Sequence, residues 1–239
     1  MVFVPAGPFE MGSQRTDDEM PVHTVTLDDF YIDQYEVTTT RFATFLNEQA
    51  SVMDMSTLSS YIGNEDFYLR YDGGVWRVVK VYADYPIVWV SWRDARAYCE
   101  WRGGRLPTEA EWEKAARGTD ERVYPWGWGI DCSVANYYHC VENGRTTDVG
   151  SHPAGASPYG AVNMAGNVRE WVNDWYYKDY YSISPPDNPP GLDSGIIKVL
   201  RGGGWRSPQD FLYVTDRAAY AQVTFRNNDV GFRCAASAP

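Results

Sequence analysis

The pattern of apolar and polar positions along the chain predicts three helices. Apolar side chains recur every three or four residues over about 38–48, 91–103 and 108–118, so each segment has one face suited to burial. The second segment opens with a Ser-x-x-Asp pattern and the third with Thr-x-x-Glu, in which side chains satisfy free N–H groups of the first turn. Glycine follows both segments and is a suitable stop.

Short runs of β-branched and aromatic residues predict strands between and after these helices. The predicted strands lie at 22–27, 30–33, 75–81, 87–90, 196–201 and 230–235. The region 124–200 is punctuated by Gly, Pro, Asn and Asp, which favours ordered loop, with 179–194 as a surface excursion. Because no internal repeat interrupts this order, residues 1–239 are predicted to form a single domain.

The composition favours an irregular globule with an aromatic core. Aromatic residues make up 15% of the chain, with ten Trp and eighteen Tyr, while amphipathic helices are few. A net charge of −11 without any basic run argues against nucleic-acid binding, since nothing would displace phosphate counterions. No apolar run reaches the ~18 residues of a membrane helix, so no membrane insertion is expected. No signal peptide precedes the first motif, and the cellular location is left open.

Five motifs occur in order along nearly the whole chain. They are VPAGPFEMGS from Val4, PIVWVSW from Pro86, RLPTEAEWE from Arg105, NMAGNVREW from Asn163, and a C-terminal stretch from VLRGGGW at Val199 to VGFRCA at Val230. Together they resemble the formylglycine-generating-enzyme (sulfatase-modifying factor) family. The resemblance implies an α+β fold of the C-type-lectin kind, irregular and loop-rich, with short antiparallel strands and two to three helices.

The same resemblance shows where the family's chemistry is missing. The family enzyme is a copper-dependent oxidase that converts a substrate cysteine to formylglycine, using two cysteines after a Gly-rich turn. Counted from the turn at 202–205, those positions fall here on Ser207 and Leu212, which offer no soft ligand for Cu(I). Iron-dependent relatives draw their histidines largely from a separate helical domain, and the three histidines here show no ligand spacing. Neither copper nor iron is therefore expected.

The resemblance also implies a structural disulfide between Cys99 and Cys234. The family's second structural pair falls on Ala116 and Arg217, so both halves of that bond are lost together. Two buried thiols remain the alternative for the first pair. The other two cysteines, eight residues apart, could pair or stay free.

Residues 163–170 match the calcium loop of the family. The resemblance places side-chain oxygens of Asn163 and Glu170, and backbone carbonyls of Gly166 and Val168, on a structural calcium ion; these four residues are called the calcium set below. Calcium prefers six to eight hard oxygen ligands, and glycine permits the tight turn that presents carbonyls inward. The alternative is that Asn167 and Glu170 hold this loop through hydrogen bonds alone.

The C-terminal stretch resembles the variable region of diversity-generating-retroelement proteins, which use the same lectin-like fold. In those proteins, template asparagine codons are randomised to NNY at displayed positions, and NNY cannot encode Trp205 and Gln209, which belong to the frame around these positions. Tyr, Phe, Arg, Asp and Ser on rigid loops suit binding surfaces, although plain packing of the fold's end is the alternative. The eleven NNY-compatible candidates, called the display positions below, are Arg206, Ser207, Asp210, Phe211, Ala218, Ala219, Tyr220, Phe225, Asn227, Asn228 and Asp229.

These observations favour a non-catalytic module that binds a protein or small-molecule ligand through a variable C-terminal surface. The alternative is an enzyme of the same superfamily with a different oxidative or siderophore-maturation chemistry. Such an enzyme should show an acid–base or metal constellation in a cleft, and the sequence contains no such constellation that we can name.

Overall fold

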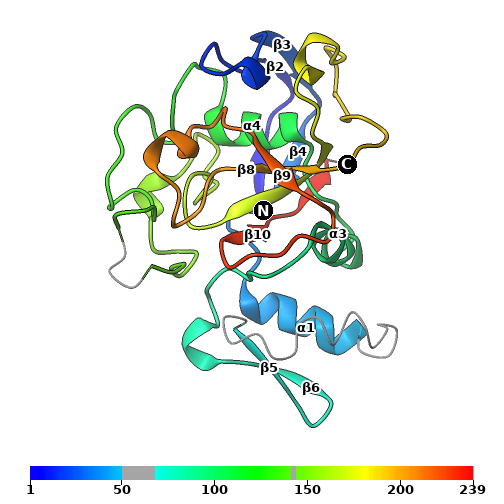
Figure 1. Ribbon diagram of the computed structural model, residues 1–239, viewed down its shortest axis with the longest axis vertical. Coiled ribbons are helices and arrows are strands. Elements are labelled where there is room, and N and C mark those ends of the chain that lie inside the picture. Colours follow the sequence, from blue (N-terminus) through cyan, green and yellow to red (C-terminus); the bar gives the residue numbers. More distant parts are fainter. Residues whose placement is uncertain (50–67, 141–143, 239) are drawn as a thin grey trace.

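The computed structural model describes residues 1–49, 68–140 and 144–238 (Figure 1). The α-helices of this part are α1 (Thr39–Gln49), α3 (Trp92–Trp101) and α4 (Glu109–Arg117). The strands are β1 (Val2–Val4), β2 (Gly7–Met11), β3 (His23–Leu27), β4 (Phe30–Ile32), β5 (Leu69–Asp72), β6 (Val75–Val78), β7 (Arg169–Trp175), β8 (Lys198–Arg201), β9 (Ala218–Ala221), β10 (Val230–Phe232) and β11 (Ala235–Ser237). Short 3-10 turns lie at Asp17–Glu19, Lys80–Tyr82, Pro153–Gly155, Tyr180–Ser182 and Gln209–Leu212.

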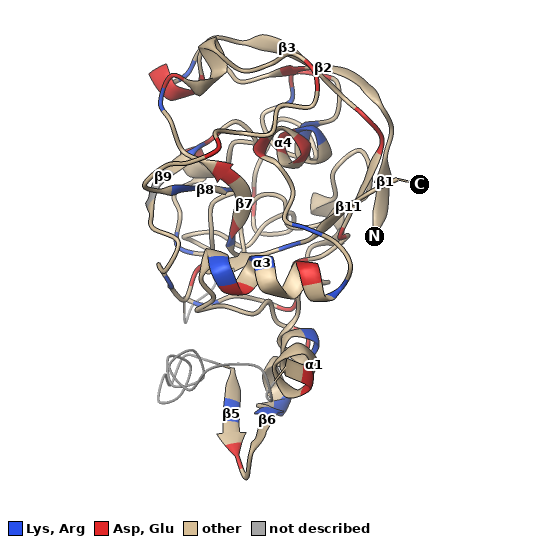
Figure 2. Ribbon diagram, turned by 90° about the vertical axis from the view of Figure 1, so that its right-hand side faces the viewer, with Lys and Arg blue, Asp and Glu red and all other residues tan. Residues whose placement is uncertain are grey.

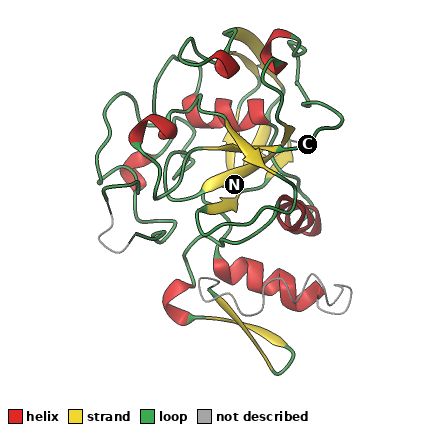
Figure 3. Cartoon of the chain, in the orientation of Figure 1, coloured by secondary structure: helices red, strands yellow, loops and turns green. Residues whose placement is uncertain are grey.

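A four-stranded sheet in the order β10-β7-β8-β9 forms the centre of the molecule (Figure 3). β7 pairs in parallel with β10 and antiparallel with β8. Two tryptophans fix α3 and the segment before it against β7, because the Trp92 indole donates to the Val172 carbonyl at 2.9 Å and the Trp171 indole to the Val90 carbonyl at 3.0 Å. The two large apolar clusters, one including α3 and the other α4, are completed by this sheet.

A second sheet, in the order β1-β4-β11, brings both ends of the described chain together. Ile32 of β4 lies opposite Val2 on one side and Ala235 on the other. Two hairpin-like pairs, β2 with β3 and β5 with β6, lie apart from these sheets. The β5–β6 pair packs with α1 at one end of the molecule (Figure 1).

The predicted helices are confirmed, and two of them begin with the capping boxes that their sequences indicated. Ser91 accepts from the Asp94 backbone and Asp94 accepts from the Ser91 backbone; Thr108 and Glu111 do the same for α4. α1 begins at Thr39, one residue later than expected.

Three strand predictions need correction. The strand predicted at 75–81 ends at Val78, and Lys80–Tyr82 forms a 3-10 turn instead. Residues 87–90 are not a strand, because Trp89 has a left-handed φ of 62° that turns the backbone between two partners. Ile87 donates to the Val37 carbonyl, and Trp89 donates to the Asn227 carbonyl. The run 230–235 is split between β10 and β11, because the chain leaves the central sheet at Arg233 and joins the second one. β7 lies within the region interpreted mostly as loop.

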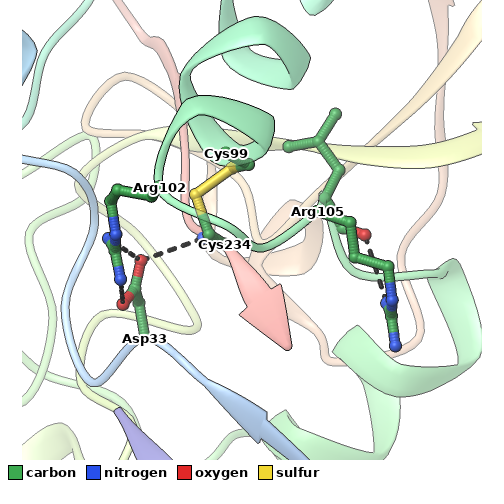
Figure 4. The surroundings of a disulfide bond; sticks show 6 residues. Asp33, Cys99, Arg102, Arg105 and Cys234 are labelled. Carbon is green, nitrogen blue, oxygen red and sulfur yellow. Dashed lines mark hydrogen bonds and ion pairs between the residues drawn. A yellow bond between two sulfur atoms is a disulfide. The ribbon is translucent and has the colours of Figure 1, made fainter. Parts of the chain in front are cut away.

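Both cysteine pairs are disulfides. Cys99 of α3 is bonded to Cys234, with Cα atoms 5.5 Å apart, which is the pair that the resemblance implied (Figure 4). Beside this bond, Asp33 accepts two hydrogen bonds from the Arg102 guanidinium and one from the Cys234 backbone. Cys132 and Cys140, which the sequence left open, are also joined. Within the described ranges, no helix has the length and apolar character needed to cross a membrane.

Candidate functional site

The display positions begin at a turn that only glycine can form. Gly202 and Gly203 have φ values of 86° and 63°. A Cβ on Gly203 would lie 2.6 Å from the Phe211 carbonyl oxygen, and one on Gly202 would lie 3.0 Å from the Trp112 ring. The turn therefore packs against Trp112 of α4 and leads into residues 205–207, of which only Arg206 is exposed.

The two positions that correspond to the family's copper cysteines have structural contacts instead. Ser207 is 1% exposed, and its hydroxyl accepts from the Gly204 backbone at 3.0 Å and from Arg169 at 3.2 Å. Leu212 is fully buried in an apolar cluster with Tyr124 and other residues. Neither side chain supplies a sulfur or imidazole ligand, so the two-cysteine chemistry has no counterpart at these positions.

The display positions are less exposed than their proposed role predicted. Exposed side chains belong to Arg206, Asp210 and Phe211, while Phe225, Asn227 and Asn228 are half-buried. Ser207, Ala218 and Asp229 are buried, so the expectation of mostly exposed positions is wrong for these three. The side chains of Ala219 and Tyr220 lie outside the described part of the structure.

Each buried display position has a physical reason for its burial. Asp229 lies between two cations, with Oδ2 at 3.8 Å from the Arg169 Nε and 3.6 Å from the Arg206 Nε. Ala218 pairs with Leu200 in the central sheet. These three partners lie 18 or more positions away in the sequence, so the NNY pattern could not reveal the burial.

Trp205 and Arg226, which are not display positions, hold the segment 225–229 that carries the last four display positions. The Trp205 indole donates to the Asn228 carbonyl at 3.2 Å, and Arg226 donates to the Trp89 carbonyl at 3.0 Å. Arg226 also forms an ion pair with Asp94 at 2.7 Å, at the first turn of α3. Trp205 and Arg226 are half-buried, and these contacts fix the segment from both sides.

The polar side chains on this segment are only partly hydrogen-bonded. Arg206 donates to Asn227 at 3.3 Å and its guanidinium lies 4.8 Å from the Trp205 ring centre. Buried polar atoms of Trp89 (Nε1), Asn228 (Oδ1) and Asp229 (Oδ1) have no hydrogen-bond partner among the described residues. Unpaired buried polar atoms are costly, so this region has capacity for further hydrogen bonds.

A buried ionic network beneath the turn was not predicted. Glu109 binds Arg217 at 2.7 Å and Arg201 at 3.2 Å, and Arg201 also binds Glu113 at 2.6 Å. Burial opposes ionisation of Glu109, but Arg217 and Arg201 hold its pKa below the ordinary value. Arg217 and Ala116 stand where the family's second disulfide pair falls, and the Arg217–Glu109 ion pair now links this segment to α4.

The loop that contains the calcium set is held by contacts to Arg233 and Glu36. The Glu170 carboxylate is fully buried and binds the Arg233 guanidinium through two bonds of 2.7 Å, and also accepts from Trp112. The Asn163 and Asn167 amides both donate to the Glu36 carboxylate. Burial raises the pKa of Glu36 to about 7, against the opposing charge of Arg233.

Members of this loop have hydrogen-bond and ion-pair partners within the protein. The charge of Glu170 is already balanced by Arg233, and the Asn163 amide nitrogen donates to Glu36 and to the Val149 carbonyl. Calcium binding by Asn163, Gly166, Val168 and Glu170 stays a prediction.

Calcium binding at this set would stabilise the folded protein. At a free calcium concentration about 100-fold above Kd, the expected gain is about 2.7 kcal/mol, because the ion binds the folded state alone. Thermal unfolding in calcium and in chelator measures it, and Glu170→Gln should abolish the difference. Equal melting temperatures of the wild type in calcium and chelator would show that hydrogen bonds alone hold the loop.

A family model and sequence relatives identify the same family for this chain. The family model described as Sulfatase-modifying factor enzyme 1-like domain matches residues 1–238. The chain is 40% identical over 239 residues to serine/threonine-protein kinase pkn1 of Chlamydia caviae, which covers 98% of this chain and 37% of that protein. It is 32% identical over 278 residues to the formylglycine-generating enzyme of Mus musculus, covering 99% and 74% respectively.

The solved structure of Treponema denticola variable protein 1 resembles this chain with a TM-score of 0.78 at 24% identity. The match covers 100% of this chain and 95% of that one. This likeness confirms the predicted irregular α+β, C-type-lectin-like fold. The chain spans only 37% of the length of the Chlamydia caviae relative, so the name of that relative refers to a much longer protein.

Proposed function

Because the chain belongs to the family of sulfatase-modifying factor enzyme 1-like domains, we propose that it is a member that binds a ligand without catalysis. Its binding surface is the C-terminal stretch from Arg206 to Asp229, held by the glycine turn and by Trp205 and Arg226. The ligand is a protein or a small molecule that contacts the exposed members of the display positions.

The observation that carries this proposal is the burial and the contacts of Ser207 and Leu212, which stand where the family enzyme has its copper-binding cysteines. Ser207 and Leu212 are buried and have structural contacts, and neither can bind Cu(I). The neighbouring surface meanwhile combines an exposed aromatic side chain, Phe211 at 44% exposure, with the exposed polar side chains of Arg206 and Asp210. This mixture is typical of binding surfaces that contact a partner through aromatic and arginine anchors.

Diversification by a retroelement is the finer part of the proposal. It is supported by the NNY-compatible display positions and by the fold shared with Treponema denticola variable protein 1, a protein named as variable. The burial of Ser207, Ala218 and Asp229 restricts it to the remaining positions, because a diversified site cannot support the core. A near-identical template repeat beside a reverse-transcriptase gene would be the genomic sign of such diversification.

The alternative is an enzyme of the same family with another chemistry, which the likeness to a formylglycine-generating enzyme keeps open. The described residues do contain perturbed carboxyl groups. Burial and the neighbouring Glu109 raise the pKa of Asp174 to about 7. However, Asp174 and Glu109 are 3% and 1% exposed, so a substrate cannot reach them without opening the core.

A copper assay tests the absence of the family's catalysis. The wild-type protein is expected to show no tight Cu(I) binding and no oxidation of a Cys-containing peptide in the presence of oxygen, because both thiolates are missing. Product formation is measured by mass spectrometry. The Ser207→Cys/Leu212→Cys double variant is the matched control, since it returns both soft ligands to the same positions. Turnover of the peptide by the wild type would overturn the proposal.

A further inference from the structure

A cavity of about 440 Å³ lies between α3 and the segment that follows β9. Its walls include the Trp92 and Trp175 rings, whose planes are 28° apart with centres separated by 6.4 Å, and the half-buried Val223. A volume of this size is in the range of small-molecule sites, which are typically lined by aromatic and apolar groups with few polar ones.

The charged residues of this cavity are mainly basic. Arg93 and Arg96 line it, and the single acidic residue among the described lining residues is Glu100. Figure 2 shows basic and acidic residues following one another along α3. Glu100 is already bound to Arg96 at 2.9 Å, whereas Arg93 is exposed and has no hydrogen bond or ion pair within the described ranges. The excess of positive charge contrasts with the net charge of −11 of the whole chain.

A third cation lies behind the aromatic wall. The Lys198 ammonium is 4.0 Å from the Trp92 ring centre and 3.7 Å from that of Trp175, and donates to the Asn173 carbonyl at 2.7 Å. Lys198 is 3% exposed, so its charge is held between the two rings rather than in water. Its position fixes both rings through cation–π contacts and adds positive potential next to the cavity.

From this geometry we infer that the cavity is a binding site for an aromatic carboxylate. The flat ring of such a ligand packs against Trp175 and Val223, beside the Trp92 ring that the Arg96 guanidinium already contacts at 5.4 Å. Its carboxylate binds the unpaired guanidinium of Arg93. Guanidinium groups bind carboxylates through paired, charge-assisted hydrogen bonds, which fix the orientation of a flat ligand. Val223 lies between the display positions Tyr220 and Phe225, but this chemistry is independent of whether those positions vary.

Binding of 2-naphthoate tests the inference, with neutral 2-naphthamide as the matched ligand. We expect isothermal titration calorimetry to show saturable binding of 2-naphthoate to the wild-type protein. Arg93→Glu and Val223→Glu, which each add a carboxylate to the lining, should weaken it by about tenfold or more. 2-Naphthamide should bind about tenfold more weakly than 2-naphthoate to the wild type.

The control variant is Arg41→Glu, which reverses another exposed helical arginine, on α1, that does not line the cavity. It is expected to leave the affinity for 2-naphthoate unchanged, and equal melting temperatures would show that all variants are folded. Absence of saturable binding to the wild type would overturn the inference. Equal affinity of the wild type and Arg93→Glu, or of the carboxylate and the amide, would overturn it as well.

Discussion

Replacement of both Cys99 and Cys234 by alanine is expected to lower the free energy of unfolding by roughly 4–5 kcal/mol. The bond joins residues 135 positions apart, and a cross-link across so long a loop restricts the unfolded chain most strongly. It also joins α3 to the segment between β10 and β11, where the chain passes from one sheet to the other (Figure 4). Urea unfolding at equilibrium, analysed with the slope as well as the midpoint, measures the change.

The second disulfide provides the internal control for this experiment. Cys132 and Cys140 are only 8 positions apart, so their replacement by alanine should cost less, about 2–3 kcal/mol in the same chain-entropy model. Equal destabilisation by the two double variants would contradict an effect that depends on loop length.

Local sequence signals were sufficient for the helices. The capping boxes of α3 and α4 involve residues three positions apart, so all their contacts lie within one turn. The family motifs likewise identified the fold and the Cys99–Cys234 bond. These features depend on short patterns or on whole-chain resemblance, and both are visible in the residues themselves.

Long-range pairing decided the features that the sequence did not show. The buried residues of β7 include the polar Glu170 and Asp174, so no alternation of apolar and polar residues marks the strand. It gains its strand character from pairing with β10 and β8. Trp89 adopts a left-handed backbone that β-propensity would not indicate. Such positions can be identified only when their partners from elsewhere in the chain are known.

The same limit applied to the candidate site. Asp229 was predicted as a displayed side chain, but Arg169 and Arg206 hold it in a buried position. The network of Glu109 with Arg201 and Arg217 joins residues 92 and 108 positions apart, and no spacing rule predicts such pairs. The basic cavity beside Trp175 was missed for the same reason, because its walls come from three separate segments.

Replacement of Arg233 by methionine should destabilise the protein by about 3–5 kcal/mol. Arg233 is fully buried, and its loss leaves the Glu170 carboxylate without a cation in the interior. The Arg233→Met/Glu170→Leu double variant should recover part of the loss, since the carboxylate that pairs directly with Arg233 is then absent as well. For the exposed pair Arg96–Glu100, replacement of Arg96 by methionine should cost no more than about 1 kcal/mol.

The pH dependence of the Arg233→Met variant separates an electrostatic effect from lost packing. The folded-state pKa of Glu36 is about 7, above its ordinary value of 4.5, so Glu36 favours folding at low pH and loses this contribution as pH rises towards 7. Arg233 opposes that shift, and its removal raises the pKa of Glu36 further. The variant's destabilisation relative to the wild type should therefore be larger at pH 7.5 than at pH 5, measured by urea unfolding at each pH. A difference independent of pH would mean that Arg233 stabilises this loop through packing and hydrogen bonds to the Asp33 and Val162 carbonyls rather than through its charge.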